Sequence, residues 1–280
     1  MSMKKIIKMI LVAFAVIGCT ERIDIELDST YQRLVVDGFI TTDTTSHVIK
    51  LTKTTDYYYN QEPPTVSGAM VQISDNEGNT VTLTESDPGI YKTPPDFYAE
   101  IGKTYSLNIY LQEEINGHKD YTASNTVLEI YPIDSISLAF RPDWSDEGFY
   151  EVQCWYQDPL VTNFYQFNIF KNDILMTDTI DKRFVTDDLL YNGSYTNGIG
   201  VGWLDQSVER EVVHPGDTIT FQAANITEEY ANFIWTLQQE ISFQTPLFSG
   251  PPANIEGNIS NGAIGYFAAY SLSYAATIAK

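Results

Sequence analysis

Residues 71–83 (VQISDNEGNTVTL) decide the fold class of this chain. Apolar residues alternate with polar ones up to Ile73, the segment 75–79 (DNEGN) interrupts them, and the alternation returns from Val81 onward. A period of two is typical of a β-strand with one buried face, and Asn and Gly favour the tight turn between two such strands. The stretch therefore predicts a β-hairpin.

Further short strands surround this hairpin. The first convincing strand runs from Arg33 to Ile40, and alternate residues from Tyr105 to Leu111 form one apolar face of another. Asn116-Gly117 then offers a turn that tolerates positive φ before the strand Tyr121 to Val127. Short strands at regular spacing, with no helical period, predict an immunoglobulin-like or transthyretin-like β-sandwich over residues 33–130.

A second series of strands follows Pro132, which marks a domain boundary. Tyr150, Val152, Cys154 and Tyr156 share one face of a strand, so Cys154 is expected to be a core thiol. Further strands are expected at 164–170, 218–223 and 264–274, whereas the glycine-rich residues 198–202 are expected in a loop. Residues 131–280 are therefore predicted to form a second β-sandwich.

One segment departs from the β pattern. Thr227 can cap a helix, acidic residues follow at 228 and 229, and apolar residues from Tyr230 to Ile241 recur at helical spacing. We expect one amphipathic helix near 228–241, packed across an edge or end of the second sandwich, because its apolar stripe must be covered. Its polar positions carry no Lys or Arg, which disfavours a helix lying in a membrane surface.

The first eighteen residues have the features of a signal peptide. Three lysines precede an apolar run, residues 9–18, that is too short to cross a bilayer, for which about 20 residues are needed. The run ends at Val16-Ile17-Gly18-Cys19, which resembles a bacterial lipobox; a plain secretory signal is the alternative. We expect residues 1–18 to be removed, Cys19 to be lipidated, and residues 19–32 to form a tether that reaches only ~40 Å when extended.

The chain is strongly acidic. It contains 37 acidic and 16 basic side chains, and removal of the three lysines of the signal peptide leaves 13 basic side chains and changes the net charge from −21 to −24. Such a surface repels the phosphates of nucleic acids and anionic membrane surfaces, so no nucleic-acid partner is expected. Scattered acids are typical of a protein that stays soluble in a crowded exterior space; the alternative is a surface that attracts cations or a basic partner.

No motif for catalysis or for a bound cofactor stands out. The three histidines are far apart, there is no His-Glu-x-x-His element, and no Gly-x-Ser-x-Gly sequence is present. We therefore expect a protein that is not an enzyme, with no catalytic residue, no cofactor and no specific metal motif. Asp187-Asp188, or Asp143 with Asp146, are candidates for a looser cation site in a loop.

Aromatic residues in predicted loops are candidates for ligand binding. Tyr57, Tyr58 and Tyr59 are consecutive, so their rings cannot all face one core, and Trp144 lies in a loop with Asp and Ser neighbours. Aromatic side chains stack on sugars or anchor protein partners, although β-sandwiches also use many of them in strands and corners. We predict that these four residues bind a ligand, with burial in the core as the alternative.

Several segments, taken in order, resemble a known family. They are LVVDGFI at 34–40, GAMV at 68–71, GIY at 89–91, HPGD at 214–217, PANI at 252–255 and GAIGYF at 262–267. With the lipobox, they resemble an outer-membrane lipoprotein family of Bacteroidota that has only a domain-of-unknown-function name and is commonly encoded beside SusC-like TonB-dependent receptors. Acidic residues within 20–32 also resemble the surface-export signal of such lipoproteins. The resemblance implies a lipid-anchored protein of the outer membrane that faces the cell surface, and it carries over no catalytic residue.

These expectations combine into one hypothesis. The chain is predicted to be a non-catalytic accessory or ligand-binding partner of a TonB-dependent, SusC-like transporter in nutrient uptake. Its expected partners are the outer-membrane bilayer, through Cys19, and the β-barrel receptor. One alternative is a structural or adhesive cell-surface protein with no transport role. Another is an extracellular hydrolase whose Ser/His/Asp triad is assembled from distant loops.

Substitution of Cys19 tests the anchor. The Cys19→Ala variant is expected to lose labelling with a fatty-acid probe and to leave the membrane fraction, because the lipid then has no sulfur to which it can be attached. Cys154→Ala is the matched control, since it removes the other cysteine and leaves the lipobox intact. Unchanged membrane fractionation of Cys19→Ala would refute the prediction.

Overall fold

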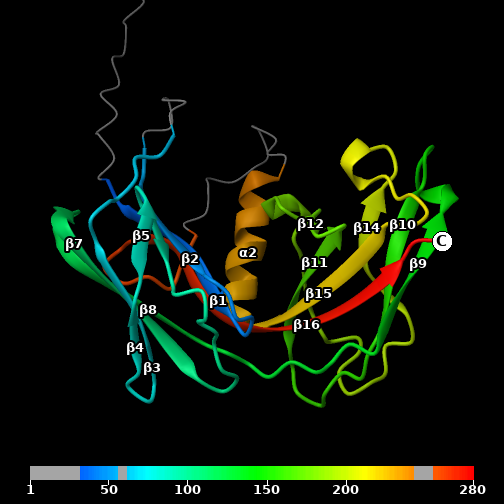
Figure 1. Cartoon of the computed structure of the whole chain (residues 1–280), viewed down its shortest axis with the longest axis horizontal. Coiled ribbons are helices and arrows are strands. Elements are labelled where there is room, and N and C mark those ends of the chain that lie inside the picture. Colours follow the sequence, from blue (N-terminus) through cyan, green and yellow to red (C-terminus); the bar gives the residue numbers. More distant parts are fainter. Residues whose placement is uncertain (1–31, 56–61, 243–254) are drawn as a thin grey trace, which may run out of the picture. The chain divides into compact units, whose positions relative to one another are not determined.

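The computed structural model describes residues 32–55, 62–242 and 255–280, which form a mainly β fold with one α-helix, as predicted (Figure 1). Short 3-10 helices, η1 (Pro142–Trp144), η2 (Ile180–Lys182) and η3 (Glu209–Glu211), lie in the connections. Within these ranges, no helix combines the length and the apolar character that a membrane span requires. Cys19, the expected signal peptide and tether, and Tyr57, Tyr58 and Tyr59 lie outside the described residues.

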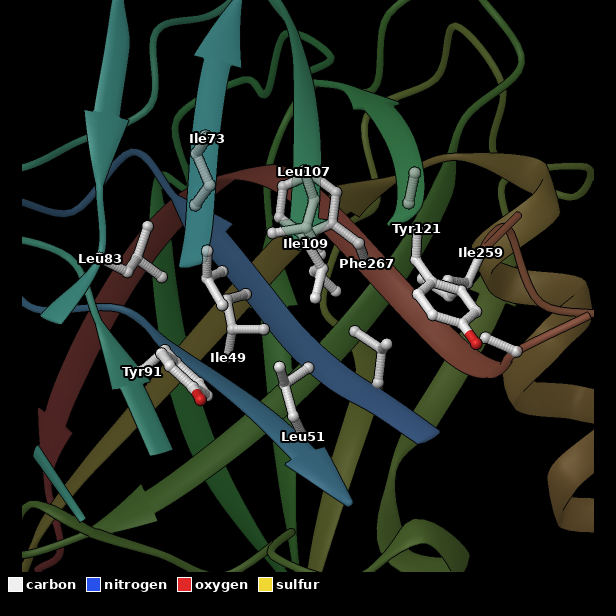
Figure 2. Packing of buried hydrophobic residues seen from close by; sticks show 14 of the residues in the cluster. Ile49, Leu51, Ile73, Leu83, Tyr91, Leu107, Ile109, Tyr121, Ile259 and Phe267 are labelled. Carbon is white, nitrogen blue, oxygen red and sulfur yellow. The ribbon is translucent and has the colours of Figure 1, made fainter. Parts of the chain in front are cut away.

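Two packed sheets form the N-terminal sandwich. One sheet contains, in order, β1 (Leu34–Thr41), β2 (Val48–Lys53), β6 (Ile90–Lys92) and β5 (Thr84–Asp87). The other contains, in order, β4 (Thr80–Thr82), β3 (Met70–Asp75), β7 (Thr104–Ile115) and β8 (His118–Thr126). Figure 2 shows the core between them, in which Ile49 from the first sheet and Leu107 from the second are fully buried.

The predicted hairpin at 71–83 is confirmed. Strands β3 and β4 pair with Ile73 opposite Val81, and the carboxylate of Asp75 accepts hydrogen bonds from the backbone N–H groups of Glu77 (3.0 Å) and Asn79 (2.9 Å). These bonds, with that from the Asn79 amide, hold the pKa of Asp75 low, at about 2. The turn is therefore stabilised by the residue that begins it, as the sequence pattern indicates.

A second sandwich follows. One sheet contains, in order, β14 (Ile199–Asp205), β10 (Phe149–Trp155) and β9 (Ser135–Arg141). The other contains, in order, β12 (Ile174–Leu175), β11 (Phe164–Lys171) and β15 (Thr218–Ile226), and β13 (Phe184–Asp187) also pairs with β11. Cys154 is fully buried in the core between them, and burial raises the pKa of its thiol to about 12. The prediction of a core thiol is confirmed.

The last strand, β16 (Ile264–Ile278), belongs to both sandwiches. Its first half pairs in parallel with β1, from Val35 opposite Ile264 to Thr41 opposite Tyr270, and its second half pairs antiparallel with β15. The two sheets become one nine-stranded sheet. Residues 264–270 thus complete the N-terminal sandwich, although they lie outside the range 33–130 that we predicted for it. Separate folding of 33–130 and 131–280 stays a prediction.

The predicted helix is α2 (Glu228–Ile241), and the Thr227 hydroxyl accepts a hydrogen bond from the Tyr230 backbone N–H at 3.4 Å. From the sequence, we expected the helix to lie across an edge or end of the second sandwich. This expectation is wrong. Tyr230 and Ile234 pack instead on the face of β15 and β16 that is turned away from both cores. Figure 1 shows the backbone of α2 beside these strands. Residues 223–226 of β15 and 265–271 of β16 are buried on both faces, so the second face also needs a cover.

The expectation of a loop at residues 198–202 is wrong, because β14 begins at Ile199. Its pairing with β10 shifts register between Val152 and Gln153, opposite Gly202 and Gly200. A Cβ at Gly202 would lie 2.8 Å from the Ile169 side chain. The glycines therefore serve a β-bulge and a close approach between sheets, for which residues without side chains are needed.

Gly265 offers a test of the parallel pairing between β1 and β16. Its φ is +101°, and an added Cβ would overlap the carbonyl oxygen of Val36. Gly265→Ala is expected to lower the free energy of unfolding by roughly 3 to 5 kcal/mol, from positive-φ strain and overlap together. Gly262→Ala is the control, since its φ is +71° but its Cβ would meet open space; strain alone costs about 1 to 2 kcal/mol. Equal losses in denaturant titrations of both variants would contradict the prediction.

Candidate functional site

A groove of about 680 Å³ lies beside the start of α2. Its walls are β8, the first turns of α2, the segment 256–258 and one residue of β16. The lining residues are mostly polar and uncharged: Thr104, Ser124, Asn125, Thr126, Thr227, Glu229, Asn232, Phe233, Thr236, Glu256, Gly257, Asn258 and Tyr266. Two are carboxylates, two are aromatic, and none carries a positive charge.

Asn125 fixes one wall of the groove. It lies in β8 and is nearly buried. Its Oδ1 accepts a hydrogen bond from the Ala269 backbone N–H at 3.2 Å, and its Nδ2 donates to the Thr227 hydroxyl at 3.3 Å. One amide therefore links β8, β16 and the residue that caps α2, so that the wall and the helix start are held in register.

Asn258 fixes the opposite wall. Its Oδ1 accepts from the Phe267 backbone N–H at 2.9 Å, and its Nδ2 donates to the Phe267 carbonyl oxygen at 2.8 Å. The amide thus takes the place of a neighbouring strand for one residue of β16. Its Nδ2 also donates to the Ser124 carbonyl oxygen at 3.1 Å, which ties segment 256–258 to β8.

Aromatic rings form the apolar part of the groove. The ring centroids of Phe233 and Tyr266 are 5.1 Å apart, and those of Tyr230 and Tyr266 are 4.8 Å apart. Burial raises the pKa of the Tyr266 hydroxyl, while hydrogen bonds with Thr227 and Asn125 act in the opposite direction. Tyr266 is therefore a neutral phenol at physiological pH, and Phe233 is half-buried beside it.

This arrangement suits a neutral ligand with many hydroxyl groups. Amides and hydroxyls both donate and accept hydrogen bonds, carboxylates accept them from ligand hydroxyls, and an aromatic ring provides a face for the C–H groups of a sugar-like ring. An anionic ligand would meet Glu229 and Glu256 with no basic side chain among the described lining residues to offset them.

The predicted ligand residue Trp144 lies elsewhere, in η1, and is 49% exposed. The Arg141 guanidinium lies 5.9 Å from its ring centroid, and the Trp203 ring centroid is 6.4 Å away. The structure thus places the exposed Trp203 next to Trp144, and neither tryptophan lines the groove. Its role in binding stays a prediction, as does that of Tyr57, Tyr58 and Tyr59.

No pattern in the sequence identifies the residues that line the groove. Asn125 and Asn258 lie 133 positions apart and are common polar residues, and Phe233 belongs to the apolar stripe that predicted packing of the helix. For metal binding, the described part of the chain contains no group of three or more His, Cys, Asp or Glu side chains placed to hold an ion.

The fold and the groove define a β-sandwich protein with a polar groove beside a helix. Comparison with known proteins places the chain in a family: residues 20–274 match the domain of unknown function DUF4249, and the chain belongs to that family. This confirms the resemblance to a family of unknown function. No curated protein matches.

A solved structure described as "a putative carbohydrate binding protein from Bacteroides uniformis" is similar over 69% of this chain and 88% of that one. The sequence identity is 10% and the TM-score is 0.15. A likeness this slight supports no conclusion about the fold or ligand of this chain.

Proposed function

We propose that this protein is a non-catalytic ligand-binding lipoprotein of the outer membrane, displayed at the cell surface and anchored through Cys19. It captures a neutral, polyhydroxylated nutrient in the groove beside α2 and acts as the accessory of a TonB-dependent transporter. The single observation that carries the proposal is the composition of the groove: amides, hydroxyls and carboxylates around an aromatic face, with no positive charge among the lining residues that the structure describes.

The physical chemistry of the groove favours such a ligand over the alternatives. A purely apolar ligand would cover polar groups of the walls without replacing their hydrogen bonds to water, at a cost of about 1 to 3 kcal/mol each. A phosphorylated or carboxylated ligand would be repelled by the groove and by a chain with a net charge of −21. A polyol satisfies the polar groups and stacks on Phe233.

The proposal treats the groove as a binding site without catalysis. Glycosidases use two carboxylates, one of them in an apolar setting that keeps it protonated. Glu229 and Glu256 are both exposed, so neither has that setting.

Substitution of Phe233 tests the groove. Phe233→Ala is expected to weaken binding of a neutral oligosaccharide, identified first on a glycan array, by roughly five- to tenfold, because a lost aromatic contact costs about 1 kcal/mol. Trp144→Ala tests the rival site, since it removes the exposed aromatic residue that the sequence predicts to bind a ligand outside the groove. Calorimetric titration measures both affinities. Loss of binding in Trp144→Ala with retention in Phe233→Ala would move the site away from the groove.

Co-purification tests the transporter partnership. The native lipoprotein, extracted from outer membranes in mild detergent, is expected to bring down a TonB-dependent β-barrel, identified by mass spectrometry. The Cys19→Ala variant is the control, because a protein without its anchor no longer meets the barrel in the membrane. Recovery of the native protein with no β-barrel would favour the structural or adhesive alternative.

A further inference from the structure

Two carboxylates are buried at one end of the second sandwich, in the loops beside β11 and β13. Asp158 and Asp188 are each only 1% exposed. Neither forms an ion pair in the described part of the chain, and segments 155–170 and 184–209 contain no Lys, Arg or His. Buried carboxylates without an opposite charge are costly, so their charge needs an explanation.

Both oxygens of Asp158 accept hydrogen bonds, whereas only one oxygen of Asp188 does. Asp158 accepts from the Tyr165 hydroxyl at 2.9 Å, from the Tyr156 hydroxyl at 3.4 Å and from the Gly193 backbone N–H at 3.3 Å. Oδ2 of Asp188 accepts from the Asn163 backbone N–H at 2.8 Å. Oδ1 of Asp188 has no donor, and the buried Oδ1 of Asn163 has none either.

The two oxygens without donors lie on one face of the sheet. Phe164 pairs with Asp187, and the Asp188 backbone N–H donates to the Asn163 carbonyl oxygen at 3.2 Å, so Asn163 and Asp188 are opposite one another. Opposite residues of an antiparallel pair project to the same face. Asn163, at 7% exposed, precedes Tyr165 by two residues and therefore shares its face, to which Asp158 is bonded.

The turn that follows Asp188 links the two carboxylates. The Asp188 carbonyl oxygen accepts hydrogen bonds from the backbone N–H groups of Tyr191 (2.7 Å) and Asn192 (2.8 Å), and the next residue, Gly193, donates to Asp158. Asp158 and Asp188 therefore lie at the same end of the sandwich, and both are buried. A side chain with an unpaired amide oxygen, also nine-tenths buried, faces the same space.

We propose that Asp158, Asp188 and Asn163 bind a calcium ion. Ca²⁺ prefers carboxylate and amide oxygens, accepts irregular arrangements of six to eight ligands, and would neutralise both buried charges. Mg²⁺ demands a stricter octahedron and retains its waters, and Zn²⁺ prefers nitrogen and sulfur.

The site differs from both cation sites expected from the sequence. Oδ1 of Asp187 accepts from the Leu189 backbone N–H at 3.2 Å, so Asp187 does not accompany Asp188. Asp143 lies in η1, and none of the described residues next to it has a buried oxygen without a hydrogen-bond donor that could serve as a second ligand. The proposed site therefore combines Asp188 with Asp158, which is distant in the sequence, and not with its neighbour Asp187.

Calcium binding by the whole mature protein tests the proposal. After treatment with a chelator, the protein is expected to bind one Ca²⁺ in a calorimetric titration and to melt at a higher temperature with Ca²⁺ than with chelator. Asp188→Asn is expected to weaken Ca²⁺ binding at least tenfold. Asp143→Asn is the matched control and is expected to bind Ca²⁺ as the parent does.

A second measurement covers the case in which Asp188→Asn does not fold. Tb³⁺ added to the parent protein is expected to emit when tyrosine is excited, since Tyr156 and Tyr165 both contact Asp158, and excess Ca²⁺ should remove this emission. No binding of either ion would overturn the proposal; the Asn163 amide would then be rotated to donate to Asp188. Loss of binding in Asp143→Asn, or unchanged binding in a folded Asp188→Asn variant, would also overturn it.

Discussion

The parallel pairing of β1 with the first half of β16 is the contact on which the rest of the structure depends. It completes the first sheet of the N-terminal sandwich, and the second half of the same strand completes a sheet of the other sandwich. The strand is buried on both faces from Gly265 to Ser271, with Phe267 in one core and Tyr270 beneath α2. Small residues make this possible, because Gly265 touches the β1 backbone and Ala268 and Ala269 leave room on either side.

The groove exists because of the same strand. Tyr266 supplies its aromatic wall, and the backbone of Phe267 holds Asn258 in place. The Ala269 backbone N–H donates a hydrogen bond to the Asn125 side chain, and the Asn125 amide in turn donates to the hydroxyl of Thr227, which caps α2. The proposed ligand site is thus assembled from three distant parts of the chain on one element.

The local parts of the fold could be predicted from the sequence. The hairpin at 71–83, the Asn116-Gly117 turn, the core thiol Cys154 and the capped helix all follow from patterns within a few residues, and positive φ at Asn116 and Gly117 agrees with the turn. What could not be predicted depends on pairing over long distances. Alternation tells which face of β1 is buried but not that its neighbour begins at Ile264. The groove and the placement of Asp158 near Asp188 likewise depend on which distant segments pair with one another. The glycines at 198–202 were expected in a loop because the β-bulge is visible only when the partner strand is known.

The place of β16 in the chain also governs when the protein becomes folded. More than two hundred residues separate β1 from its parallel partner in the sequence, so one edge of β1 stays unpaired until β16 is available. Contacts this distant in sequence form slowly, because a long loop must close first. Neither sandwich can complete its larger sheet before residues 264–278 are available, so the completion of one is coupled to the completion of the other.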